Sequence, residues 1–110
     1  MTPTELLIAA KAKIDTPSKW TQGYLARNSS NNRVSCFSPR AVCFCSSGAL
    51  MVAEDDNNVS SYTTTRAQER LVSAMGGSIP DFNDSHTHSQ VMAAWDKAIE
   101  NVRSQTVVSN

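Results

Sequence analysis

The sequence has no excess of charge of either sign and no long hydrophobic run. Its 110 residues include ten basic and ten acidic side chains, so the formal net charge is zero. A general nucleic-acid-binding protein needs a basic surface that neutralises phosphates, and this composition excludes that class. No apolar stretch is long enough to span a bilayer, and the N-terminus does not resemble a signal peptide. We therefore expect a cytoplasmic protein that contacts neither nucleic acid nor membrane.

Cysteine is also scarce, and its spacing is uninformative for metal binding. The three cysteines are Cys36, Cys43 and Cys45. Because their number is odd, we do not expect a disulfide framework, and a reducing compartment is favoured. No C-x-x-C sequence or other zinc-ligand spacing is present. The sequence therefore predicts neither a bound metal nor a cofactor.

What is present is an ordinary hydrophobic fraction, 40%, arranged mostly with helical periodicity. Length and composition predict one domain over residues 1–110, with an ordered core from about 3 to 104 and a frayed C-terminal tail. Apolar spacing and capping residues predict four helices: Pro3 to near Asp15, residues 39–53, about Thr65 to Gly76, and Thr87 to near Ser104.

The connections between these helices are expected to be mostly irregular. Residues 22–27 and 33–37 flank a polar loop and fit either a short hairpin or an irregular insertion. Residues 54–58 and 78–86 are interpreted as a solvated connection and a compact linker. The predicted fold class is therefore mainly α, a compact domain of about four helices with a short hairpin or irregular insertion after the first helix.

The segment 39–53 is the expected centre of the fold, because it is apolar over more than one helical face. Ser38 can cap it, and a proline follows in the first turn. Its Ser-Ser-Gly sequence at 46–48 is unusual, since glycine inside a helix costs roughly 1 kcal/mol relative to alanine. Two explanations remain open: the close approach of another helix or of Trp20, or a pocket beside Cys45.

A cysteine-dependent hydrolase or transferase is one candidate activity. Cys45, His88 and Asp84 (or Asn83) supply the residue types of a nucleophile, a base and an orienting group. However, Cys45 lies almost two turns inside the predicted helix, where the helix dipole gives its thiol little activation. A cysteine on an apolar helix face is more commonly a small buried hydrophobic residue. The alternative role of Asn83 and Asp84 is to hold the linker through local hydrogen bonds.

A site for a small anionic or nucleotide-like ligand is a second candidate. Arg40 falls in the first turn of the predicted central helix, where backbone N–H groups favour negative charge. Trp20 and Tyr24 have rings on which a base or sugar can stack. The complete candidate ligand-binding set is Trp20, Tyr24, Arg27, Arg40, Asn83 and His88. In the alternative interpretation the arginines are surface residues and Trp20 belongs to the core.

Several short motifs occur in an order that resembles one family. They are Trp20-Thr21-Gln22-Gly23, Ala26-Arg27, Pro39 with Ala41-Val42, Phe44-Cys45-Ser46-Ser47-Gly48-Ala49-Leu50, Phe82-Asn83-Asp84, Thr87-His88 and Trp95-Asp96-Lys97-Ala98-Ile99. Together they resemble a family of small domains of unknown function encoded by bacteria and phages, over roughly residues 6–102. The chain departs from this pattern in its polar loop at 28–32 and at Phe44, where tryptophan is commoner.

The resemblance implies a single domain but carries no activity. It groups eight residues that either surround one site or form the core and its polar contacts: Trp20, Gly23, Arg27, Cys45, Gly48, Asn83, Asp84 and His88. The leading hypothesis is a non-enzymatic binding protein, for example an anti-defence protein that sequesters a nucleotide-type signal or blocks a host protein. It would then act in the host cytoplasm. The alternatives are the enzyme that uses Cys45 and His88, and a homo-oligomeric scaffold without a ligand.

Overall fold

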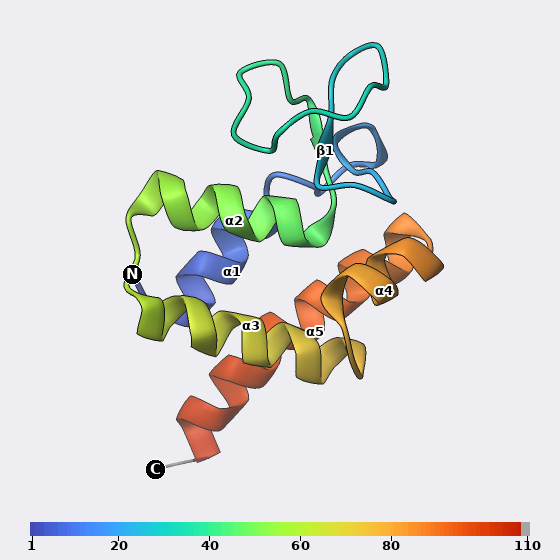
Figure 1. Ribbon diagram of the computed structural model, residues 1–110. Helices are drawn as coiled ribbons and strands as arrows, with labels where there is room; N and C mark the ends of the chain where they lie inside the picture. The colour runs from blue at the N-terminus through green and yellow to red at the C-terminus, as the bar shows by residue number, and fades with distance from the viewer. Residues whose placement is uncertain (109–110) are drawn as a thin grey trace.

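The computed structural model describes the backbone of residues 1–108 and the side chains of residues 1–100, and this part of the chain is mainly helical (Figure 1). Its elements are α1 (Pro3–Lys11), the 3₁₀ helix η1 (Pro17–Lys19), β1 (Ala26–Arg27), β2 (Cys43–Phe44), α2 (Ser46–Asn57), α3 (Ser61–Met75), α4 (Ile79–Ser85) and α5 (His88–Val108). The expected mainly α fold is confirmed, with five α-helices instead of four among the described residues. None of these helices combines the length and hydropathy needed to cross a membrane.

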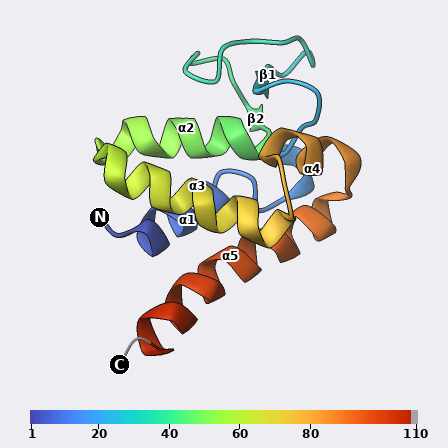
Figure 2. The ribbon, with the colours of Figure 1, turned by 60° about the horizontal axis from the view of Figure 1, so that its bottom comes forward.

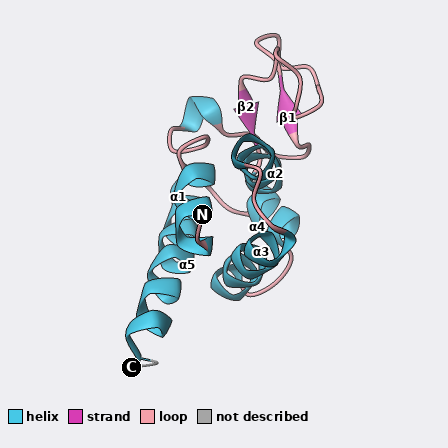
Figure 3. Cartoon of the chain, turned by 90° about the vertical axis from the view of Figure 1, so that its left-hand side faces the viewer, coloured by secondary structure: helices cyan, strands magenta, loops and turns pink. Residues whose placement is uncertain are grey.

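The core lies between α1, α2, α3 and α5. Helix α1 packs against the other three, and α3 packs against α5. Figure 3 shows α1 and α5 next to each other, with α2 and α3 facing them. Leu6 and Leu7 of α1, Leu71 of α3 and Trp95 of α5 are fully buried there. Burying each such side chain stabilises the fold by roughly 1.5–3 kcal/mol, so this cluster contributes much of the free energy that holds the helices together.

Local capping signals predicted several helix ends correctly. Thr2 and Glu5 form the expected capping box, with the N–H of Glu5 donating to Oγ1 of Thr2 at 3.1 Å. The N–H of Thr87 donates to Oε1 of Gln90 at 2.9 Å at the start of α5. Gly76 ends α3 in the left-handed conformation, with φ of 76°. These ends depend on residues within one turn, which is why the sequence reveals them.

Other helix boundaries differ from the prediction. Helix α1 ends at Lys11 and not near Asp15, and α3 begins at Ser61, because Ser60 and not Thr65 provides its cap. Helix α4 occupies most of the segment expected to be a linker and is capped by Ser78. Helix α5 extends to Val108, past the expected end near Ser104, and projects beyond the other helices (Figure 2). Residues 109 and 110 of the expected frayed tail lie outside the described residues.

The predicted start of the central helix, at residue 39, is wrong. Residues 38–42 form turns and loop, Cys43 and Phe44 form β2, and α2 begins only at Ser46. Strand β2 pairs with β1 in antiparallel register, and the N–H of Cys45 donates to the carbonyl of Leu25 at 3.1 Å. This pairing engages backbone N–H and C=O groups that a helix starting at residue 39 would need. The partner strand β1 lies in an earlier segment of the chain, so local sequence does not reveal it. At its other end, α2 includes most of the expected solvated connection.

The expected hairpin between residues 22–27 and 33–37 is reduced to a single antiparallel bridge, between Arg27 and Arg33. Strand β1 pairs with β2 instead, and the chain between them, residues 28–42, forms a long irregular loop next to the N-terminal end of α2 (Figure 1). The insertion after the first helix is therefore irregular, which is one of the two predicted alternatives.

Gly48 sits in the first turn of α2 because the backbone of Leu25 needs its space. A Cβ atom at this position would lie 2.2 Å from the carbonyl oxygen of Leu25. The same oxygen accepts the hydrogen bond from the N–H of Cys45. The close approach expected for the Ser-Ser-Gly sequence thus exists, but its partner is a loop carbonyl and not another helix or Trp20.

We predict that Gly48→Ala destabilises the protein by about 1–3 kcal/mol, because the new methyl group displaces the Leu25 carbonyl. Gly77→Ala is the matched control, since a Cβ atom there meets nothing within 4 Å. Denaturant unfolding followed by circular dichroism measures both variants. Equal stability of the two variants would show that the contact with Leu25 is not rigid.

Candidate functional site

Asn83 lies at the centre of a buried polar network and is completely inaccessible to solvent. Its Oδ1 accepts hydrogen bonds from Nε1 of Trp20 at 2.8 Å, from the N–H of Ser46 at 3.0 Å and from Oγ of Ser46 at 2.9 Å. Its Nδ2 donates to the carbonyl of Thr21 at 3.0 Å and to Oδ1 of Asp84 at 3.1 Å. One amide therefore joins α4 to the N-terminus of α2 and to the segment that follows η1.

The network extends in two directions from Asn83. Nε1 of Trp95 donates to Oγ of Ser46 at 3.0 Å, which connects the network to the core of α5. Oδ1 of Asp84 accepts from the N–H of Gly23 at 2.9 Å. Gly23 has φ of 82°, a conformation that side-chain-bearing residues rarely adopt. We call Trp20, Ser46, Asn83, Asp84 and Trp95 the Asn83 network.

The structure brings Trp20, Asn83 and His88 of the predicted ligand set together, but their polar atoms bind one another or the backbone. Nε2 of His88 donates to the carbonyl of Ile14 at 2.7 Å, and its ring meets that of Trp20 edge-on, with centroids 5.5 Å apart. The guanidinium of Arg27 donates to Oγ1 of Thr21 and to the carbonyls of Gln22 and Asn31. Each of these side chains has a structural partner within the chain.

The two other members of the ligand set lie on the surface. Tyr24 is exposed and carries the guanidinium of Arg33 5.4 Å from its ring centroid. Arg40 is exposed in the loop of residues 28–42 and is not in a helical turn. The expectation that the N-terminus of the central helix brings Arg40 to an anion is therefore wrong, because the helix begins six residues later.

Cys45 is the N-cap of α2 and lines a small pocket of about 160 Å³. The expectation that it lies almost two turns inside the helix is wrong for the same reason. Burial raises the pKa of the Cys45 thiol above its ordinary value, so the thiol is protonated at neutral pH. Asp84 lines the same pocket, and no histidine is among the described residues that do so. His88 is instead held by Ile14.

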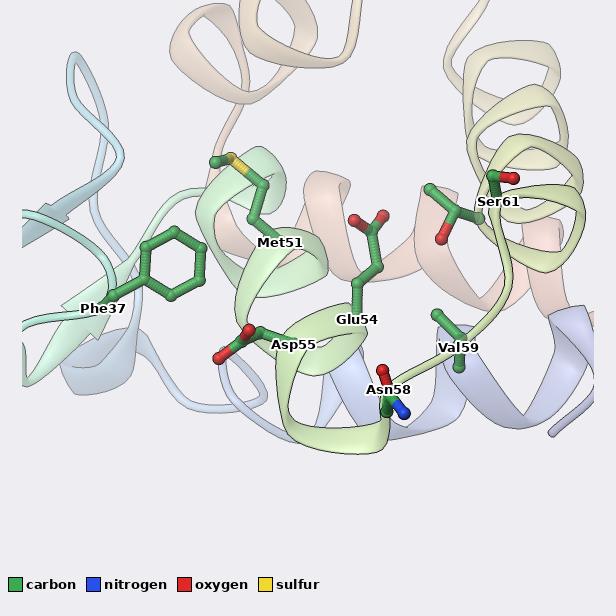
Figure 4. A pocket seen from close by; sticks show the side chains of 8 residues that line it. Phe37, Met51, Glu54, Asp55, Asn58, Val59 and Ser61 are labelled. Atoms are coloured by element: carbon green, nitrogen blue, oxygen red, sulfur yellow. The ribbon is translucent and has the colours of Figure 1, made fainter.

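A larger groove lies between the loop of residues 28–42, the C-terminal half of α2 and the start of α3, and has a volume of about 430 Å³ (Figure 4). We call it the Phe37 groove; its lining consists of Phe37, Met51, Glu54, Asp55, Asn58, Val59, Ser61 and Thr64. Phe37 is 53% exposed and Met51 is 37% exposed. None of the eight lining residues belongs to the ligand set or the catalytic set predicted from the sequence. One local signal was Phe37, an aromatic residue in the serine-containing segment 35–38.

Glu54 is the unusual residue of the groove. Figure 4 shows its carboxylate between Met51 and the start of α3. Oε1 of Glu54 is buried, and it has no hydrogen-bond partner among the described residues. Burial raises the pKa of the Glu54 carboxyl above its ordinary value of 4.5. A buried acceptor without a donor costs free energy, and such groups in native structures call for an explanation.

The cysteine, histidine and acidic side chains do not form a metal centre in the described part of the chain. No group of three or more of them there is placed to hold a metal ion. The cysteines of the described residues are free thiols, of which Cys36 and Cys45 are buried.

The fold and its polar network define a small helical domain in which a loop insertion is fixed to the N-terminus of one helix. The chain belongs to the Family of unknown function (DUF6197), whose sequence model matches residues 1–101. This assignment confirms that the chain is a member of a family of unknown function, as the motif order indicated. No curated protein and no solved structure matches the chain.

We predict that Asn83→Ala destabilises the protein by at least about 3 kcal/mol, because it leaves several buried donors without an acceptor. Asn57→Ala is the matched control, since the Asn57 amide donates to the carbonyl of Ala53 near the exposed end of α2. The control loses less than about 1 kcal/mol. Denaturant unfolding followed by tryptophan fluorescence measures both. Similar losses in the two variants would contradict the central position of Asn83.

We predict that Glu54→Gln stabilises the free protein at neutral pH, by less than about 1 kcal/mol because the carboxyl is only partly buried. The pKa of the Glu54 carboxyl is higher in the folded than in the unfolded protein, so the wild type loses stability as this carboxyl ionises at pH values above 4.5. The stability advantage of Glu54→Gln is therefore full at neutral pH, and it disappears at pH values low enough to protonate Glu54 in both states. Asp55→Asn, an exposed change at the same helix end, controls for the helix dipole. Thermal unfolding at several pH values provides the measurement, and a pH-independent difference would argue against burial as the cause.

Proposed function

We propose that this protein is a non-enzymatic binding protein and that its partner is another protein, which it holds in the Phe37 groove. The observation that carries the proposal is the convergence of two exposed apolar side chains from separate segments. Phe37 comes from the loop of residues 28–42 and Met51 from α2, and both line one groove (Figure 4). Aromatic residues and methionine are enriched at protein interfaces, and methionine adapts its shape to a partner.

The dimensions of the groove agree with this proposal. Its volume of about 430 Å³ is enough for one or two side chains of a partner. Phe37 and Met51 both leave exposed apolar surface along this groove. Contiguous exposed apolar surface of this kind is a feature of interaction sites. The resemblance to domains encoded by bacteria and phages makes a host protein the partner to test first.

A nucleotide-type ligand, the other partner class expected from the sequence, has less support. Recognition of a phosphate requires donors that are free to bind it. The donors of Trp20, Arg27 and His88 are engaged within the chain. Arg40 is exposed in the loop of residues 28–42. The Cys45 enzyme has less support as well, because its thiol is buried and protonated.

We predict that Met51→Gln weakens binding of groove-specific peptides by about tenfold or more, because it removes an apolar contact surface from the groove. Peptides are selected on the wild-type chain from a displayed library of random sequences, and their affinities are measured by fluorescence anisotropy. Val72→Gln is the matched control, since Val72 is 40% exposed on α3 and does not line the groove. The control keeps wild-type affinity.

Other outcomes would overturn the proposal. If no peptide is enriched, or if the enriched peptides bind Met51→Gln and wild type equally, the groove is not a protein-binding site. If the mass of the protein rises with concentration and Met51→Gln restores the monomer, the groove is covered by a second copy. That result would support the scaffold alternative instead.

A further inference from the structure

The Phe37 groove differs in charge from the chain as a whole. The complete sequence is neutral, with ten basic and ten acidic residues. The eight described lining residues include Glu54 and Asp55 and no lysine, arginine or histidine. The groove therefore has a negative local field within a neutral molecule. Binding partners have complementary charges at their interface. We therefore expect the Phe37 groove to favour a positively charged group on its partner.

Within residues 1–100, whose side chains the structure describes, no basic side chain forms an ion pair with Glu54. Lys13 forms an ion pair with Asp56 on the same helix, with Nζ and Oδ2 2.9 Å apart. Ser61 and Thr64 line the groove beside Glu54, yet neither hydroxyl donates to its buried oxygen. A carboxylate that is partly desolvated and lacks a donor gains more from an arriving cation than an exposed one, because water competes less.

The apolar part of the groove suits the rest of a basic side chain. Arginine and lysine bury their aliphatic stems along apolar surface, and Met51 and Val59 provide such surface on either side of Glu54. Phe37 adds an aromatic surface against which an apolar residue beside the basic one can pack. Arginine fits better than lysine because its planar, weakly hydrated guanidinium can make two parallel hydrogen bonds to one carboxylate.

We infer that the partner presents an arginine next to an apolar residue, with the guanidinium against the Glu54 carboxylate and the apolar side chain against Phe37 and Met51. This inference rests on the proposed protein-binding function and specifies the partner's recognition element. Glu54 is the specificity-determining residue of the groove, and Asp55 contributes only through its more exposed charge.

Two short probes that differ only in charge test this inference. They are N-acetyl-phenylalanyl-arginine amide and its citrulline counterpart, which is nearly isosteric and neutral. We expect the arginine probe to shift the amide resonances of residues 51–64 in NMR titrations and to bind about tenfold more tightly than the citrulline probe. Glu54→Gln reduces this ratio to about one, whereas the matched variant Asp55→Asn retains most of it.

The outcomes separate the inference from the function on which it rests. Equal affinities of the two probes, or a ratio that Glu54→Gln leaves unchanged, would overturn arginine recognition. So would the absence of groove shifts with the arginine probe. In each case, library peptides that lose affinity for Met51→Gln would still support a protein-binding groove. If no such peptides exist either, both proposals fail.

Discussion

The architecture depends on the side chain of Asn83, which replaces water for several buried polar groups at once. Its carbonyl oxygen accepts from Trp20 and twice from Ser46, and through Ser46 it is connected to the indole of Trp95. A tryptophan inside a fold needs a partner for its N–H. Here Trp20 donates to the Asn83 amide, and Trp95 donates to the Ser46 hydroxyl, which itself donates to that amide. Hydrogen bonds in a low-dielectric interior strengthen one another, so these segments are ordered together. Helix α4 is short, and this network accounts for its fixed position against the start of α2.

The position of the groove follows from this network. Asn83 fixes Ser46 at the start of α2 and the segment around Thr21, and the carbonyl of Leu25 then lies in the first turn of α2, where Gly48 leaves space for it. The pairing of β1 with β2 fixes both ends of the loop of residues 28–42 at that point. Cys36 of this loop is buried, and its neighbour Phe37 is consequently held where it lines one groove with Met51. The residues that the motif order grouped together thus form the scaffold, and the Phe37 groove lies beside that scaffold.

The sequence predicted what is determined locally and missed what depends on distant partners. Thr2, Gly76 and Thr87 act within one helical turn, so the caps at these residues could be recognised. The Ser-Pro pair at 38–39 has the same local signature, but strand pairing with residues 26–27 overrides it. Cysteine ranks poorly as an N-cap, and so nothing in the sequence marked Cys45 as the start of α2. The motif order did place Trp20, Asn83 and His88 in one set, although no pattern could indicate that their donors would be used internally.

Glu54 illustrates the same limit at the candidate site. Within the run of acidic and amide residues at 54–58 the sequence gives Glu54 and Asp55 equal weight, and both resemble parts of a solvated connection. The helix separates them by about 100° around its axis, which turns Glu54 toward the start of α3 and leaves Asp55 exposed. Desolvation then raises the pKa of one carboxyl through packing alone. A group that weakens the free protein persists most readily where a bound partner removes the penalty, and a cation is the simplest partner that does so. The burial of Glu54 and the missing donor together therefore favour recognition of a charged partner over passive surface exposure.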